Sequence, residues 1–534
     1  MQVEALPHLP AGLTLRLTPR PEQARVDVEM HLVGPDATAM KELVIARAWA
    51  NIDGFAAIRA LRVRDARGEI ATRPGPDAGP DRTIELERSP LLEHVEIRYS
   101  VASAPANAPR FALHVDRERF SGVGHTFLLL PRLDKPAAVH LQIRSSTLAS
   151  GASGATSFGT GDEIEVSATS REIAHGVYAS GRLRAIERPN AGRLVLLGRP
   201  AFDADAAHRA ITKAHRALER TFVSVHEEKP ERFSYIVMTE PGLGKGHDGA
   251  LLGKSFGLWM GSEAPFDASR IIAATHELAH AWIGGAVRLV SDRGDEQAWF
   301  SEGFAVHYAR KVALAEKLVN PDEFADDVEK TLGPGVSDLG SHPIPRSREA
   351  YQRGALYAAQ IDAAIQKSSK GKRSLDDLMR KLFSRRSSEA STSVPVDVFR
   401  DLVAEELGPG RGEELSWVMV QGHGEIRLDD DTFGKCFHRS RTKTKVFELG
   451  FDRQSMRRTP QMIRGLVAGS AAARAGLVEG AIVLSSKLPS EFDTDFDKPV
   501  EIVVAAPRGS KKIRYLPVGE REDVHWAAKK GCSD

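Results

Sequence analysis

Cysteine, net charge and long apolar runs are all scarce in this sequence. Its 534 residues include two cysteines, Cys436 and Cys532, which lie far apart, so a disulfide framework and any cysteine-based metal site or cluster are excluded. Lys and Arg together number 73 and Asp and Glu 72, which excludes a global basic field for nucleic acid or an anionic membrane. No apolar run approaches the roughly 18 residues of a membrane helix, so no transmembrane segment is expected.

The beginning of the chain, "MQVEALPHLPAG", has no basic stretch followed by an apolar one, so no signal peptide is visible. The sequence as it stands predicts a cytoplasmic protein, or a periplasmic or secreted one whose leader has been removed. Hydrophobic residues make up 42% and charged residues 27%, which is ordinary for a soluble globular protein. The length suffices for three or four domains.

Residues 1–185 are expected to form a β-sandwich-like domain. Several short segments there alternate apolar and polar residues between clusters of Gly, Pro, Asp and Asn, which is the pattern of strands and turns. These segments are "LTLRLTP", "ARVDVEMHLVG", "KELVIARAW", "RTIELER", "HVEIRYSVAS", "AVHLQIRSS" and "DEIEVSAT". The run "STLASGASGATSFGTGD", residues 146–162, is rich in Gly, Ser and Thr and predicts a long surface loop.

The pattern changes near residue 200, where helical spacing begins. "FDADAAHRAITKAHRALERTF" predicts a helix with an acidic start, "RFSYIVMTE" a strand, "PGLGKGHDG" a loop and "ALLGKSFGLWMG" a further strand-like run. A helix is expected at 267–285, with Asp267 or Ser269 as N-cap and Gly284–Gly285 as its stop. Further helices are predicted at 296–317, 350–368, 374–385 and 396–407, and strand character returns from about 445 to about 520.

The helix expected at 267–285 carries the run "AATHELAHAWIGG", residues 273–285. His276 and His280 are four residues apart, so on a helix both imidazoles project from one face and suit one zinc ion. Glu277 lies beside the first histidine and can reach a water molecule at the metal as a general base.

A catalytic zinc also needs a third protein ligand. The best candidate is Glu302 in "WFSEGFAVHY", on the next predicted helix, because the intervening residues leave room for a loop and a return. Asp292, Asp295 and Glu296, nearer the loop, remain alternatives.

A pair of histidines on a helix can also be solvent-exposed and bind no metal. Here apolar residues surround the pair, so much of the helix is expected to be buried, and buried imidazoles beside a buried carboxylate are costly unless something satisfies them. These neighbours are Ile271, Ile272, Leu278, Ala279, Trp282 and Ile283. We therefore favour zinc binding.

Two runs, "HELAHAWIGG" and "WFSEGFAVHY", resemble those of the Glu-ligand zinc aminopeptidases, and "YQRGALYAAQIDAAIQKSSKGKRSLDDLM" resembles the glycyl aminopeptidase family specifically. The resemblance covers nearly the whole chain and implies a multidomain α+β protein. Its expected parts are an N-terminal β-sandwich-like domain at 1–185, a thermolysin-like α/β zinc catalytic domain at 186–310, a helical part at 311–443, a PDZ-like domain at 444–522 and a tail at 523–534.

The resemblance implies one zinc ion per chain, with His276, His280 and Glu302 as ligands and Glu277 polarising the water. It places Tyr351, which opens "YQRG", where the family has a tyrosine that stabilises the oxyanion.

A phenol suits that role because it is neutral at pH 7 and donates a hydrogen bond to developing negative charge. The alternative for Tyr351 is a tyrosine that packs at a helix start. Tyr308 and Tyr357 are expected to be core residues.

The resemblance also assigns a substrate-binding strand to "GALLGKSF", and we expect Gly249, Ala250, Leu251 and Leu252 to align a peptide there by main-chain pairing. The related pattern is Gly-Gly-Leu-Glu-His or Gly-x-Met-Glu-Asn, and Leu252 stands where its glutamate would grip the α-amine of the substrate. A leucine cannot pair with an ammonium group. Candidates to replace that glutamate are Asp248, Glu263 and Glu296.

Near the C-terminus, "FELGFD", "IRGLVAGSAAARAGLVEGAIVLSS" and "PVEIVVAAPRGSKKIRYLPV" resemble a PDZ domain of the protease-associated type. Such domains bind extended peptides or C-termini beside a loop that Leu449, Gly450 and Phe451 would form here. The alternative is a module that only packs on the catalytic domain.

Taken together, these features predict a zinc-dependent metallopeptidase that acts on peptide substrates and is aminopeptidase-like by resemblance. Two alternatives stay open. One is an endopeptidase on the same scaffold, and the other is a non-catalytic protein that binds peptides through the PDZ-like domain.

Overall fold

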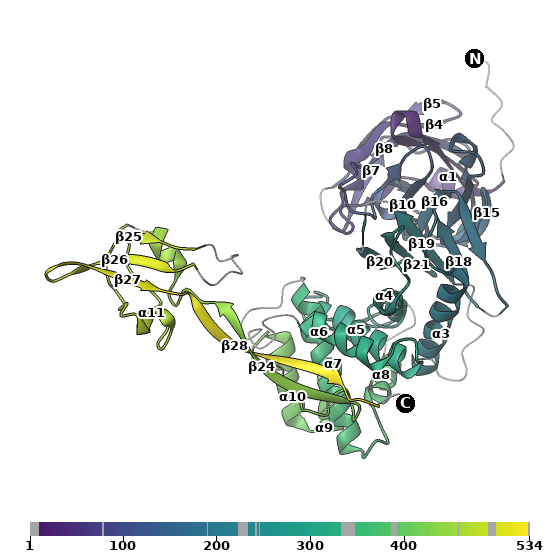
Figure 1. Cartoon of the computed structure of the whole chain (residues 1–534). Coiled ribbons are helices and arrows are strands. Elements are labelled where there is room, and N and C mark those ends of the chain that lie inside the picture. The colour runs from purple at the N-terminus through teal and green to yellow at the C-terminus, as the bar shows by residue number, and fades with distance from the viewer. Residues whose placement is uncertain are drawn as a thin grey trace. The chain divides into compact units, whose positions relative to one another are not determined.

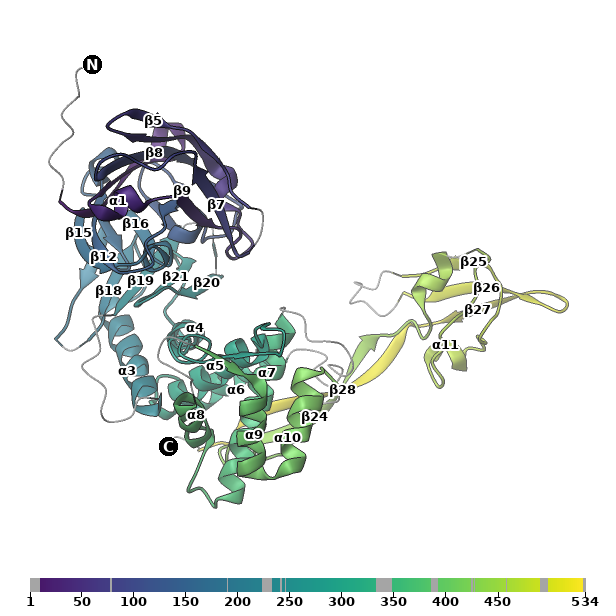
Figure 2. The same cartoon turned by 180° about the vertical axis from the view of Figure 1, so that it is seen from behind.

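A computed structural model of the chain describes residues 10–76, 79–189, 191–222, 233–240, 243–244, 246–332, 348–385, 392–423, 426, 428–457, 459–489 and 498–531. The chain divides into two compact units, which are Met1–Asn320 with Pro343–Gly422 and Pro321–His342 with His423–Asp534. Figures 1 and 2 label their elements from opposite sides. None of the helices in the described ranges combines the length and the apolarity that crossing a membrane requires.

The N-terminal part of the first unit consists mostly of sheet, as its alternating segments predict. A seven-stranded sheet has the order β15 (Glu163–Ala168), β12 (Ala137–Ile143), β1 (Gly12–Arg20), β2 (Arg25–Val33), β8 (His94–Ala102), β4 (Ile58–Asp65) and β5 (Gly68–Ile70). A four-stranded sheet has the order β11 (Leu130–Pro131), β3 (Glu42–Ala46), β7 (Asp81–Leu86) and β6 (Thr72–Pro74). A five-stranded sheet has the order β14 (Gly159–Thr160), β13 (Ser153–Thr156), β16 (Val177–Gly181), β10 (Phe120–Val123) and β9 (His114–Val115).

One hydrophobic core joins these sheets. Alternate residues of β1 and β2, such as Leu15 and Val28, pack in it with Leu43 of β3 and Ile84 of β7, while the residues between them face the other side. This is the period of two that a sheet buried on one face imposes on its strands.

The expectation of a long surface loop at 146–162 is wrong. The segment contains β13 and β14, and Gly154, Ala155 and Thr156 are buried. Its small residues allow close packing, since a Cβ atom on Gly154 would lie 3.0 Å from Cδ1 of Ile143. Composition alone does not distinguish small residues that pack closely from small residues that are exposed.

A second five-stranded sheet positions the predicted metal site. Its order is β17 (Leu183–Ile186), β18 (Arg193–Leu197), β19 (Ser234–Glu240), β21 (Ser255–Gly261) and β20 (His247–Leu251), so β20 is an edge strand. One face packs on the N-terminal sheets through residues such as Met238 and Val177. The other face carries Tyr235, whose hydroxyl lies 2.8 Å from Nδ1 of His215 on α3 (Ala204–Phe222). Helix α4 (Ala268–Ala279) lies on the same side, where its Glu277 contacts Gly249 of β20.

The run at 250–261 is not a single strand but most of a hairpin. Strand β20 pairs antiparallel with β21, and the chain turns between Leu252 and Ser255, which exchange backbone hydrogen bonds of 2.7 and 3.2 Å. Gly253 has a φ of +64°, a left-handed conformation that glycine adopts without strain. The glycine that reads as part of a strand therefore makes the turn.

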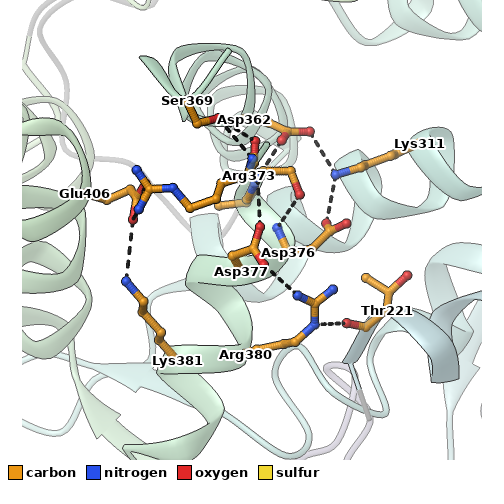
Figure 3. A network of polar contacts seen from close by, with 12 residues as sticks. Thr221, Lys311, Asp362, Ser369, Arg373, Asp376, Asp377, Arg380, Lys381 and Glu406 are labelled. Atoms are coloured by element: carbon orange, nitrogen blue, oxygen red, sulfur yellow. Dashed lines mark hydrogen bonds and ion pairs between the residues drawn. The ribbon is translucent and has the colours of Figure 1, made fainter. Parts of the chain in front are cut away.

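Among the described residues of the first unit, five α-helices follow α4, and the first four of them lie close to the predicted ranges. They are α5 (Ala298–Ala315), α7 (Arg348–Ser368), α8 (Leu375–Ser384), α9 (Val396–Leu407) and α10 (Pro409–Leu415). Ser374 caps α8 through a capping box with Asp377. Arg373, just before α8, pairs with Glu406 of α9 at 3.0 Å, and Arg380 donates to the carbonyl of Thr221 on α3 at 3.0 Å (Figure 3).

The second unit has two parts. Strands β24 (Phe437–Phe447) and β28 (Val518–Ala528) form an antiparallel pair, on which α6 (Pro321–Leu332) packs through Phe324 and Phe437. A three-stranded sheet of β25 (Val483–Lys487), β26 (Val500–Ala506) and β27 (Gly509–Tyr515) shares a core with the short helix α11 (Ala471–Arg474).

Three of the expected domain limits fall inside helices or strands of the structure. The limit at 310 cuts α5, the limit at 443 cuts β24, and residues 523–528 of the expected tail belong to β28. The reason is pairing between distant segments, because β24 and β28 are joined by their hydrogen bonds and not by sequence proximity. Cys436, just before β24, is disulfide-bonded, which two cysteines far apart in the sequence do not predict; Cys532 lies outside the described residues.

Candidate metal centre and active site

Helix α4 brings two histidines to one place. Its N-cap is Asp267, whose side chain accepts a hydrogen bond from the backbone N–H of Arg270, and Ile272 and Leu278 are buried on its inner face. His276 and His280, one turn apart, direct their Nε2 atoms at each other across 3.1 Å. The helix ends at Ala279, so His280 is its C-cap residue, and Gly284–Gly285 lie beyond its end.

Helix α5 supplies the third group. Oε2 of Glu302 lies 3.5 Å from Nε2 of His276 and 3.5 Å from Nε2 of His280. These three residues form a cluster whose ligand atoms all lie within 4.8 Å of one another. The other three candidates for a third ligand, Asp292, Asp295 and Glu296, are exposed in the loop before α5 and do not belong to this cluster.

The three donor atoms fit a zinc ion. Ligand atoms at 2.0–2.1 Å from a tetrahedral zinc lie roughly 3.3–3.4 Å apart, and the separations here are 3.1 and 3.5 Å. Nδ1 of His280 lies 3.1 Å from the carbonyl oxygen of Ile283, so an N–H on Nδ1 donates there and leaves a lone pair on Nε2. A metal ion also explains why two imidazole nitrogens and a carboxylate converge on one point.

The charges of the site favour a cation. Burial alone would lower the pKa of His280, but the hydrogen bond and charge of Glu302, with the charge of Glu277, raise it to about 9. Burial would raise the pKa of Glu302, but its hydrogen bonds to the two histidines hold that pKa well below its usual range. The surroundings thus stabilise positive charge at the point where the three side chains meet.

Glu277 lies between α4 and the edge strand β20. Its side chain is half-buried, and its carboxylate accepts a hydrogen bond from the backbone of Leu251. Burial raises its pKa, while the neighbouring histidines act in the opposite direction. A Cβ atom on Gly249 would lie 2.6 Å from Oε1 of Glu277, so the strand backbone packs directly on this carboxylate.

Tyr351 comes from the first turn of α7. Its ring centroid lies 5.9 Å from that of His276, its hydroxyl hydrogen-bonds to Glu302, and its side chain keeps access to solvent. Burial and the charge of Glu302 raise the pKa of Tyr351, so the phenol stays protonated and can donate. Tyr308 and Tyr357, in contrast, are fully buried core residues.

The four residues of the expected substrate strand do not share one face. Gly249 and Leu251 face α4, whereas Ala250 and Leu252 face the N-terminal sheets, and Leu252 is 0% exposed in a cluster with Trp259. Because hydrogen-bonded pairs alternate along an antiparallel ladder, the backbone groups of Gly249 and Leu251 point away from β21, toward the open edge.

The candidates for an amine-binding carboxylate do not belong to the cluster of metal ligands. Asp248, Glu263 and Glu296 are exposed side chains, and Asp248 lies on the face of β20 opposite to Gly249.

Two contacts that complete the site were not anticipated from the sequence. They are the contact between Gly249 and Glu277 and the hydrogen bond of His280 to the carbonyl of Ile283. A glycine in a strand next to a catalytic motif is a weak signal of close approach, and a backbone carbonyl leaves no mark in the sequence at all.

No protein-family model and none of the curated proteins matches this sequence. Solved structures do match. An aminopeptidase N family protein from Idiomarina loihiensis superposes with a TM-score of 0.67 at 14% identity, over 97% of this chain and 98% of that chain. An M1 zinc metallopeptidase from Deinococcus radiodurans, a mutant bound to a Tyr-Ser-Ala substrate, gives a TM-score of 0.48 at 18% identity, over 78% of this chain and 94% of that one.

The first similarity extends over nearly the whole chain and shows a shared fold. Its sequence identity is too low to carry activity from one protein to the other, and the second similarity is too weak to add to the argument. The function must therefore be argued from the site.

Proposed function

We propose that this protein is a zinc-dependent metallopeptidase. The observation that carries the proposal is the convergence of His276, His280 and Glu302 on one point, with Glu277 and Tyr351 beside it. The chain also shares its fold with an aminopeptidase N family protein, which is compatible with this proposal.

A zinc ion held by the two histidines and Glu302 supplies a Lewis acid for the peptide carbonyl and lowers the pKa of water. Glu277 removes a proton from the attacking water and later delivers it to the leaving amine. Its burial favours this role, because a raised pKa brings a carboxylate closer to the pH at which it both accepts and releases a proton. Tyr351 donates a hydrogen bond from its hydroxyl to the developing oxyanion.

The edge strand β20 positions the peptide. The outward backbone groups of Gly249 and the outward carbonyl of Leu251 pair with an extended substrate, which places its scissile bond over Glu277. Gly249 has no side chain to obstruct this approach.

The variant Glu277→Gln tests the proposal. We expect zinc content to stay near one equivalent while kcat falls by a factor of about 10³ or more, since the general base is lost. Glu405→Gln, an exposed position on α9, is the control and should keep full activity. A purified protein that neither contains nor takes up zinc, or a Glu277→Gln variant with full turnover, contradicts the proposal.

We further propose aminopeptidase-like action of the glycyl aminopeptidase type, with endopeptidase action as the second candidate. The observation that favours the second is the burial of Leu252, an apolar side chain at the position where the related pattern has its amine-binding glutamate. Acetylating the N-terminus of a cleaved peptide separates the two. Blocked cleavage supports an aminopeptidase, and unchanged cleavage supports an endopeptidase.

We also propose that residues 444–522 form a PDZ-like module that binds peptides. Leu449 and Phe451 are buried in its core, Gly450 has a φ of +81°, and the hydroxyl of Tyr515 donates to the carbonyl of Leu449 at 2.6 Å. The alternative function, a non-catalytic protein that binds peptides, would depend on this module alone. That alternative predicts that the zinc-loaded protein binds peptides and does not cleave them.

A further inference from the structure

Helices α5 and α7 touch through their backbones at one point. A Cβ atom on Gly303 would lie 2.5 Å from the carbonyl carbon of Gly354 and 2.6 Å from the nitrogen of Ala355. A Cβ atom on Gly354 would lie 2.8 Å from Cα of Gly303 and would overlap the carbonyl oxygen of Trp299. Neither helix can accept even a methyl group here without moving.

This contact lies between the two functional side chains. Gly303 directly follows Glu302 on α5, and Gly354 is three residues, about one turn, after Tyr351 on α7. The hydroxyl of Tyr351 hydrogen-bonds to Glu302 across the same crossing. The separation of the two backbones at the glycines therefore sets how far Tyr351 stands from Glu302 and from the histidines.

The C-terminal part of α7 is anchored through Asp362. Lys311 of α5 donates to Oδ2 of Asp362 at 3.0 Å and to Oδ1 of Asp376 at 2.8 Å. Oδ1 of Asp362 also accepts from the backbone N–H of Leu375 at 2.9 Å. Figure 3 shows Lys311 between the two carboxylates. Asp362 is almost fully buried, so this tie is shielded from solvent.

A helix that is anchored at Asp362 and displaced at Gly354 must shift at its N-terminal end. That end carries Tyr351. Glycine is also a poor helix former, so two glycines in mid-helix disfavour the helices themselves and need a reason in the packing. The close crossing supplies this reason, since only glycine allows such an approach.

We propose that Gly303 and Gly354 are positioning residues for the reaction, which hold the Tyr351 hydroxyl at its working distance from the metal centre. This inference rests on the proposed peptidase function. A displacement of about 1 Å in a catalytic group can reduce a rate about 100-fold. The added methyl group in Gly354→Ala is expected to cause a shift of this size.

The test compares wild type, Gly354→Ala, Tyr351→Phe and the double variant, each loaded with zinc. We expect kcat of Gly354→Ala to fall by about 10- to 100-fold, with KM within about threefold and one equivalent of zinc retained. The double variant should be no slower than Tyr351→Phe alone, because no hydroxyl remains to be misplaced. A purely structural role would instead multiply the two losses.

Gly410→Ala is the matched control. Gly410 is exposed on α10, and nothing lies within 4 Å of the position its Cβ would take, so this variant should behave as wild type. If Gly354→Ala does not fold, Gly303→Ala makes the same displacement from the opposite helix and takes its place in the cycle.

A kcat at the wild-type level in either glycine variant, or losses that multiply in the double variant, overturns the positioning role and leaves the peptidase proposal intact. A zinc-loaded wild type that cleaves no peptide overturns both.

Discussion

Gly249 of the edge strand and Glu277 of the metal-binding helix are in direct contact, and a Cβ atom on the glycine would lie 2.6 Å from Oε1 of the carboxylate and 2.8 Å from its Cδ. The contact joins the two halves of the site, because β20 offers backbone groups to a peptide and α4 offers the base. Burial beneath this strand is also what raises the pKa of Glu277.

The first prediction concerns that contact. Gly249→Ala should lower kcat by about 10-fold or more, because the new methyl group displaces the Glu277 carboxylate from its working position. Zinc content and melting temperature should stay close to wild type, since the strand lies at the edge of the sheet. Steady-state kinetics with metal analysis checks this, and a variant of unchanged kcat contradicts it.

Tyr351→Phe should lower kcat by about 10²- to 10³-fold, as is typical for the loss of one donor to an oxyanion. The Tyr351 side chain is partly exposed, so the melting temperature should change little. Tyr357→Phe on the same helix serves as control, since that side chain is buried in the core and should leave kcat unchanged. Equal kcat values for the two variants would refute the role of Tyr351.

Leu252→Glu should not create an amine clamp. The side chain is 0% exposed among apolar neighbours, so a carboxylate there should cost on the order of 3 kcal/mol or more of stability. We expect a lower melting temperature and no new preference for substrates with a free N-terminus. A stable variant with such a preference would show that Leu252 faces the substrate.

Metal removal should destabilise the protein. Three ligands preformed on two helices bind zinc in the folded state, so free zinc at 100 times its dissociation constant should add about 2.7 kcal/mol to the free energy of unfolding. Thermal unfolding with chelator and with zinc measures this effect. His280→Ala should remove most of the difference, and a variant that keeps it would place the metal elsewhere.

The last prediction concerns pH and the N-terminal sheets. Hydrogen bonds from the Arg88 guanidinium at 2.6 and 2.9 Å, with backbone N–H groups of Leu91 and Arg67, lower the pKa of Asp65 to about 2. A lowered folded pKa stabilises the fold above the ordinary value near 4, and this stabilisation is lost as the pH falls from about 4 to about 2.

Asp65→Asn should therefore lower stability by about 2 kcal/mol at pH 7, and the difference from wild type should shrink below pH 4. Melting temperatures across this range are the measurement, with exposed Asp36→Asn as the control. If the difference between the two proteins is constant with pH, the contribution of Asp65 to the stability of the fold does not depend on its ionisation.

The sequence alone determined what depends on neighbours along the chain. The spacing of His276 and His280 puts both on one helical face because the helix repeats every 3.6 residues, and alternation marks the strands of the N-terminal sheets. The helix at 396–407 is found at those residues, and Asp267 caps α4, since these features follow from local periodicity and capping chemistry.

Features that depend on distant segments arise from the packing of the folded chain and leave no local signal in the sequence. The position of Glu302 and the distance to Tyr351 follow from how α4, α5 and α7 cross, and no periodicity encodes a crossing. The burial of Leu252 follows from which face of β20 meets the N-terminal sheets. Small residues at 146–162 and at Gly303 and Gly354 look permissive in sequence, yet they are the positions where close packing leaves no space for a larger side chain.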